Sequence, residues 1–99
     1  MDVLTVPQLA VPTAHDAVAI VNRWLHREVG MAVHVMTARF DPTTFCWHVP
    51  IELAYASHGT LGVVGDVYLH AATGAFAGRP ASEELLRRAE ALAVACGID

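Results

Sequence analysis

The stretch FCWHVPIELAY at residues 45–55 decides the fold that this sequence predicts. Its larger apolar side chains occupy every second position, and smaller or polar residues stand between them. Such a period of two is typical of a β-strand with one buried face. Residues 61–71 repeat the alternation, and residues 32–40 show a weaker form of it. The sequence therefore predicts a meander of three antiparallel strands, to which a short return at residues 75 and 76 would add a fourth.

Two turns determine how these strands pair. The Asp-Pro-Thr-Thr sequence at 41–44 and the Ser-His-Gly sequence at 57–59 are typical of tight connections. The resulting register pairs Trp47 with Leu69 and puts the apolar positions of the strands on one face, hereafter the inner face. A slip of one residue would turn every side chain to the other face. Because Pro50 cannot donate a ladder hydrogen bond, we expect a bulge or a bend at that residue.

A helix is predicted on each side of the meander. Thr13 is a suitable N-cap, apolar residues follow it at helical spacing, and Gly30 closes this first helix. Ser82 is predicted to cap the second helix, and Gly97 to end it. The predicted fold class is therefore α+β: an N-terminal helix packed on a three- to four-stranded antiparallel meander, followed by a C-terminal helix.

The length and composition of the chain suit one domain that has a partner. Since Pro7 and Pro12 disfavour helix before them, residues 1–12 are predicted to form an extended arm and residues 13–99 a single α+β domain. Hydrophobic residues make up 55% of the chain and charged residues only 16%, against a usual figure of about 25%. This shortage of charge predicts that apolar surface is covered in a homo-oligomer or by a protein partner.

The charge pattern argues against several functional classes. The formal net charge is −4, and the six basic residues are scattered arginines, so nucleic acid is not an expected partner. The N-terminus lacks the basic and apolar regions of a signal peptide, and no apolar run approaches the roughly 20 residues that cross a bilayer. We therefore expect a cytoplasmic chain without a membrane partner, in which Cys46 and Cys96 are free thiols.

Residues 65–74, GDVYLHAATG, resemble the end of a PepSY-type domain. The shared features are a glycine, a Val-Tyr-Val-like strand and a Thr-Gly turn, and with the preceding helix and meander the resemblance covers about residues 13–77. His70 and Ala75 stand where acidic residues are usual in that family. The resemblance implies a cystatin-like helix-on-sheet fold and a binding or regulatory role.

The face of the sheet away from the core, hereafter the outer face, is predicted to gather Cys46, His48 and His70. In the predicted register Cys46 lies between Arg39 and His70, on neighbouring strands whose paired Cβ atoms are about 4.5–5.5 Å apart. Thiolate and imidazole groups bind zinc or copper, so these three residues are candidate metal ligands. A Cys46 nucleophile beside a histidine, and histidines that are merely solvated, are the alternatives. Because an open sheet face rarely offers a concave pocket, no catalytic residue and no cofactor are predicted.

A candidate interface shares the outer face. Its predicted residues are Val33, Val35, Arg39, Val64 and Tyr68. An apolar strip beside arginine and tyrosine has the composition of a protein interface. The alternative is that the second helix folds back over this face and covers it.

These observations favour a non-enzymatic protein–protein interaction or regulatory module that self-associates. Two alternatives stay open: a metal- or small-ligand-binding module centred on the outer face, and an antitoxin-like regulatory subunit of a neighbouring protein.

Overall fold

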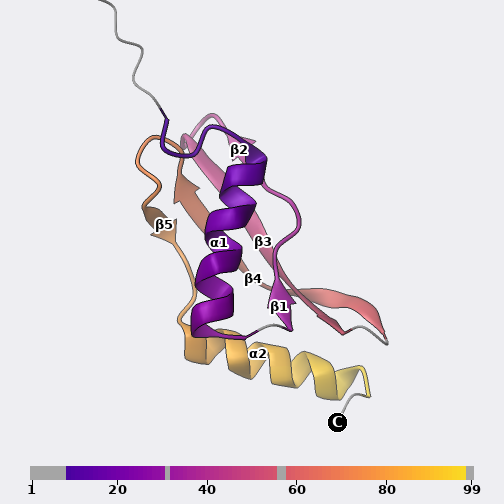
Figure 1. The fold of residues 1–99 in the computed structure, drawn as a ribbon. Coiled ribbons are helices and arrows are strands. Elements are labelled where there is room, and N and C mark those ends of the chain that lie inside the picture. Colours follow the sequence, from indigo (N-terminus) through magenta and orange to yellow (C-terminus); the bar gives the residue numbers. More distant parts are fainter. Residues whose placement is uncertain (1–8, 31, 56–57, 98–99) are drawn as a thin grey trace, which may run out of the picture.

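The structure, a computed structural model, describes residues 9–30, 32–55 and 58–97, so most of the predicted arm at 1–12 lies outside the described residues. The elements follow in the order α1 (Ala14–Glu28), β1 (Val33–His34), β2 (Arg39–Asp41), β3 (Cys46–Tyr55), β4 (Gly59–His70), β5 (Phe76–Gly78) and α2 (Ser82–Ala95) (Figure 1). All strand pairs in this part of the chain are antiparallel. The predicted α+β class is thus confirmed, with a sheet of five strands instead of three or four.

The additional strands have two sources. The short return after residue 74 forms β5, which pairs with β4, and the predicted strand at 32–40 is interrupted. Residues 35–38 leave the ladder between β1 and β2, which both pair with β3. At this break Asn22 of α1 stands where a neighbouring strand would be: its side-chain Nδ2 donates to the carbonyl of Val35 (3.0 Å), and its Oδ1 accepts from the Val35 N–H (2.9 Å). The helix is therefore tied directly to the edge of the sheet.

Helix α1 begins and ends close to the predicted residues. The hydroxyl of Thr13 accepts a hydrogen bond from the backbone N–H of Asp16 (3.1 Å), which is the expected N-cap. At the other end the N–H of Gly30 donates to the carbonyl of Leu25 (2.9 Å), and its φ of 142° is one that favours glycine. The buried residues of the helix are Ala17, Val21, Trp24 and Leu25.

The predicted pairing of β3 with β4 is confirmed over the first half of the two strands. Between residues 46 and 51 of β3 the partners are those expected, including Trp47 opposite Leu69. Pro50 pairs regularly with Asp66, and the register shifts only after the next residue and once again further on. The prediction of a bulge or bend at Pro50 is therefore wrong, and the irregularities lie nearer the hairpin.

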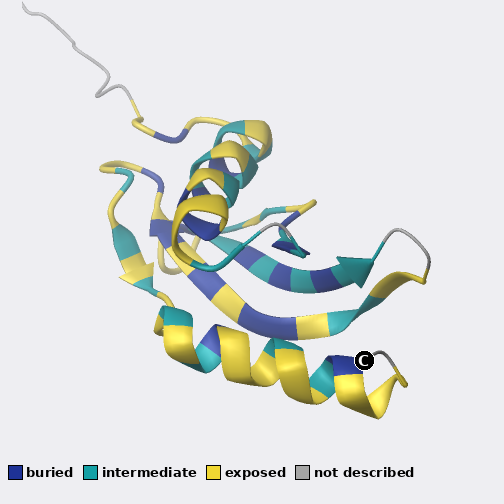
Figure 2. Cartoon of the chain, turned by 60° about the horizontal axis from the view of Figure 1, so that its bottom comes forward, coloured by how far each residue is buried: buried dark blue, intermediate teal, exposed yellow. Residues whose placement is uncertain are grey.

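The first shift is a β-bulge at Val64. Ile51 is opposite Gly65 while Glu52 is opposite Val63, so Val64 is an extra residue in β4. Val64 is only 5% exposed and Val63 is 57% exposed. The sequence predicts the opposite orientation for these two valines, and that prediction is wrong because the bulge inverts the alternation from this point. Figure 2 shows buried and exposed positions succeeding one another along β4.

Both helices pack on the inner face. Gly65 is opposite the buried Ile51, and a Cβ at Gly65 would lie 2.9 Å from Cδ2 of Leu85 in α2. A Cβ at Gly62 would likewise lie 3.3 Å from Cδ2 of Leu92. Figure 1 shows α2 crossing near the end of α1 at a steep angle. The alternative in which the second helix covers the outer face is therefore wrong, and no helix of the described chain covers that face.

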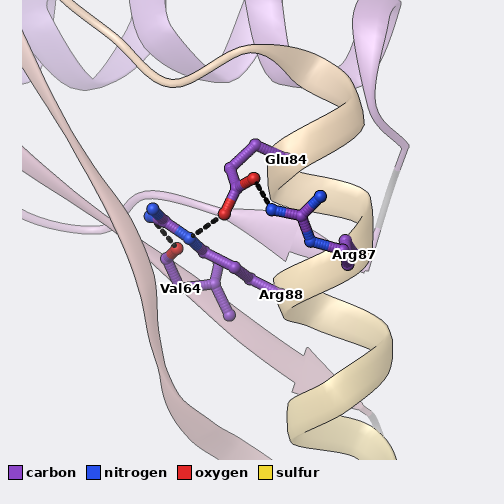
Figure 3. Close-up of polar contacts among 4 residues, drawn as sticks. All are labelled: Val64, Glu84, Arg87 and Arg88. Atoms are coloured by element: carbon purple, nitrogen blue, oxygen red, sulfur yellow. Dashed lines mark hydrogen bonds and ion pairs between the residues drawn. The ribbon is translucent and has the colours of Figure 1, made fainter.

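Helix α2 begins without the predicted cap. Its N-cap residue is Ala81, which has no side chain able to accept a hydrogen bond, and Ser82 is already the first helical residue. Glu84 in the first turn instead pairs with Arg87 and with Nε of Arg88 (2.7 Å) (Figure 3). Nη1 of Arg88 in turn donates to the carbonyl of Val64 (3.2 Å). Arg88 thereby joins α2 to the bulge in β4.

We expect Glu84→Gln to destabilise the fold in a pH-dependent manner. The hydrogen bond from Arg88, together with the charge of Arg87, lowers the pKa of Glu84 below its ordinary value of 4.5, while desolvation acts in the opposite direction. A lowered pKa contributes stability above the unfolded-state value, and this contribution is lost as the pH falls through the folded-state value. The difference in melting temperature between the native protein and the variant should therefore be largest above pH 4.5. Below pH 4.5 the difference should decrease towards zero.

Thermal unfolding followed by circular dichroism across this pH range measures that difference. Glu83→Gln is the matched control, because Glu83 shares the first turn of α2 but forms no ion pair among the described residues. A constant difference at all pH values, or an equal response of the two variants, would contradict the role assigned to Glu84.

Candidate functional site

The outer face is organised in rows that run across the strands. One row places Asp41, Cys46 and His70 side by side on β2, β3 and β4. The next places Arg39, His48 and Tyr68 side by side, and a further one, nearer the hairpin, places His34, Glu52 and Val63. Trp47 between the first two rows packs against the core, so the predicted orientations of Trp47 inward and His48 outward are confirmed.

Cys46 lies in contact with one of the two histidines predicted to join it. Its Sγ is 3.5 Å from Nδ1 of His70, and it also donates to the carbonyl of Thr44 (3.4 Å). On the other side its neighbour is Asp41, whereas the sequence predicts Arg39. The turn causes this difference: it occupies residues 42–45 instead of 41–44 and ends on Phe45, whose φ of 56° lies in the left-handed region. Such a backbone conformation in a non-glycine residue leaves no clear trace in a sequence.

His48 contacts Asp66 and Tyr68 and not Cys46. Its Nε2 lies 2.7 Å from Oδ1 of Asp66, and its ring stacks on Tyr68 with the ring centroids 4.9 Å apart. Among the described residues no three histidine, cysteine or acidic side chains are arranged to hold a metal ion. The predicted set of Cys46, His48 and His70 is therefore not assembled, because the Asp66 carboxylate and the Tyr68 ring hold His48 in a different arrangement.

The predicted interface is only partly on the surface. Arg39 and Tyr68 are exposed on the outer face as expected. Val33 and Val35 are each 2% exposed and Val64 is 5% exposed, so all three belong to the core and the prediction is wrong for them. Val33 faces inward with its partner in β3, Val35 lies where the strand breaks, and Val64 is turned inward by the bulge.

Two hollows lie on the outer face on either side of the stacked pair of His48 and Tyr68. One, of about 390 Å³, is lined by Asp41, Thr44, Cys46, Tyr68, His70 and Ala77. The other, of about 260 Å³, is lined by Thr37, Ala38, Arg39, His48 and Pro50. The exposed ring of Tyr68 lines the larger of these two hollows, and the ring of His48 lines the smaller.

A third and larger hollow lies beyond the outer face, and the sequence does not predict it. Its volume is about 540 Å³, and it is bounded by α2, the turn that follows α1, β1 and the end of β3. Two apolar residues of α2 at its border, Leu86 and Val94, are 44% and 73% exposed. The helical spacing of Leu85, Leu86, Ala89, Leu92, Ala93 and Cys96 predicts one buried stripe. The exposure of Leu86 contradicts that prediction, and the sequence therefore misses this hollow.

The fold and these surfaces define a small α+β domain with two helices on one face of an antiparallel sheet and an uncovered second face. Comparisons with protein-family models, with curated proteins and with solved structures found no match to this chain. The resemblance to a PepSY-type domain therefore stays a prediction. No helix among the described residues combines the length and the apolar composition that crossing a membrane requires.

Proposed function

We propose that this chain is a non-enzymatic interaction module that self-associates through its outer face. The observation that carries the proposal is the packing of both helices on the inner face, which leaves a sheet face with an exposed tyrosine uncovered. Tyr68, 43% exposed, is stacked on His48 and therefore held in place before a partner arrives. Such preorganised aromatic side chains are typical centres of protein interfaces.

The second copy of the chain is the partner that the charges of this face fit. Arg39 and Glu52 form no ion pair with any described residue, and they lie in different rows of the face. In a twofold contact a surface meets its own copy, so Arg39 of each molecule can approach Glu52 of the other. The Tyr68 ring of each copy would enter a hollow beside the His48–Tyr68 pair of the other.

The contact between Cys46 and His70 does not lead us to propose an enzyme. A catalytic thiol has to meet a substrate, whereas Cys46 is only 4% exposed and its Sγ already donates to a backbone carbonyl. The pair also lies on an open sheet face and not in a site closed to water. A buried thiol that fills the space under Tyr68 and His70 agrees with these observations.

Light scattering after size-exclusion chromatography tests the proposal over a range of concentrations. We expect a dimer for the native chain, a monomer for Arg39→Glu because it would face Glu52 of the other copy, and a restored dimer for Arg39→Glu combined with Glu52→Arg. Arg23→Glu, an exposed site on α1, is the matched control and should leave the dimer intact. A native chain that is monomeric at its highest soluble concentration, or a double variant that stays monomeric, would overturn the proposal.

A further inference from the structure

The large hollow next to α2 has the dimensions of a ligand site. Its volume of about 540 Å³ lies within the range of roughly 300–1,000 Å³ that is usual for small-molecule pockets. It is lined by Val29, Gly30, Ala32, Val33, Leu53, Tyr55, Leu86, Ala89, Glu90, Ala93 and Val94. These residues come from three elements, β1, β3 and α2, and from the turn that follows α1, so distant parts of the chain together form the hollow, which we call the helix groove.

The surface of the helix groove is mainly apolar. Val33 and Leu53 from the sheet and Ala93 from α2 are almost fully buried beside it. Leu86 and Val94, at its border, keep 44% and 73% of their surface in contact with water. Since each Å² of apolar surface removed from water contributes about 25 cal/mol, an apolar occupant that covers these side chains is stabilised there.

One charge faces this apolar surface. Glu90 is the sole carboxylic acid among the described residues that line the groove, and no arginine or histidine lines it. The two arginines of α2, Arg87 and Arg88, both pair with Glu84 (Figure 3). Glu90 forms no ion pair within the described chain.

We propose that the helix groove binds a small apolar molecule that carries one amine. The apolar body lies between the exposed Leu86 and Val94 and the half-buried Tyr55 of β3, and the ammonium group pairs with the carboxylate of Glu90. The charge selects among ligands of equal length, because a fatty acid would bring a second carboxylate to Glu90. This site lies away from the outer face, so the inference goes beyond the proposed self-association and does not depend on it.

Calorimetric titration with decylamine, decanol and decanoate tests the proposal, with the two ionic compounds below their micelle concentrations and decanol below its solubility limit. We expect the amine to bind more tightly than the alcohol by a factor on the order of five, which is what an exposed ion pair contributes, and the carboxylate to bind most weakly. Glu90→Gln should remove the preference for the amine and leave the affinity for the alcohol unchanged. Glu83→Gln, on the same helix but outside the groove, is the matched control.

A second variant locates the site. Ala89→Trp fills the helix groove and should abolish binding of all three compounds; if that variant does not fold, Val94→Glu at the exposed border should weaken binding of the alcohol. Equal affinity for amine and carboxylate, or binding that persists in the filled variant, would overturn the proposal. Occupation of the groove by a second copy of the chain would also overturn it; in that case Val94→Glu would dissociate a dimer that Arg39→Glu leaves intact. That result would contradict the proposed outer-face contact as well. A failed titration alone would contradict only the ligand proposal.

Discussion

Val64→Lys should lower the free energy of unfolding by at least about 3 kcal/mol, whereas Val63→Lys should change it by less than about 0.5 kcal/mol. Val64 is 5% exposed and packs in the core, so a lysine there brings an unpaired charge into an apolar environment. Val63 is 57% exposed and directly opposite Glu52, where a lysine gains a cross-strand partner of opposite charge. Two adjacent valines thus receive the same substitution with very different results.

Urea unfolding of both variants at one protein concentration measures the effect. The comparison tests the bulge itself, because a β4 strand that continued without the extra residue would place Val63 inward and Val64 outward. A Val63→Lys variant that is the less stable of the two would therefore show that the alternation is not inverted. The register shift beyond Ile51 would then have to be abandoned.

Leu85→Ala should cost about 2–5 kcal/mol of stability, and Leu86→Ala less than about 1 kcal/mol. Leu85 is fully buried and its Cδ2 occupies the space above Gly65 where a side chain would otherwise be. The truncation leaves a cavity between α2 and β4 that neither element can easily fill. Leu86 is 44% exposed at the helix groove, and its truncation removes little packing.

Urea unfolding again measures the difference between these neighbours, and the far-ultraviolet circular dichroism of Leu85→Ala shows whether α2 stays helical. A small effect at Leu85 would mean that α2 is not anchored on the inner face at this residue. A large effect at Leu86 would mean that the helix is rotated about its axis relative to the sheet, and that the groove is closed.

The parts of the fold that the sequence predicts correctly are those in which several local signals agree. Thr13 and Gly30 delimit α1 because capping and the limits of the apolar pattern coincide there. The pairing of Trp47 with Leu69 follows from large apolar residues that alternate with polar ones on both strands. Each of these predictions is carried by side chains that differ strongly between the two faces.

The failures occur where the two faces carry similar side chains. Val63 and Val64 are identical, so hydrophobicity cannot tell which of them turns inward, and Gly62 and Gly65 have no side chain to indicate a face. The bulge is decided instead by the packing of α2, whose Leu85 lies against the backbone of Gly65. Tertiary contacts of this kind are not expressed in the local pattern of a strand.

The same reasoning applies to the candidate sites. The outward orientation of Cys46, His48 and His70 follows from the alternation and is confirmed by the pairing. Their failure to converge depends on Asp66, which the sequence places nearby without indicating that it pairs with His48. The helix groove depends on the position of α2 relative to the sheet, for which the sequence has no signal.

The double hydrogen bond between Asn22 and Val35 has a consequence for how molecules of this protein meet. An edge strand with free N–H and C=O groups can pair with strands of other molecules, and repeated pairing of this kind leads to fibrous aggregates. Here the two backbone groups of Val35 are already satisfied by a side chain from a helix, which cannot be extended in the manner of a strand. Growth of the sheet past this edge is therefore blocked at Val35.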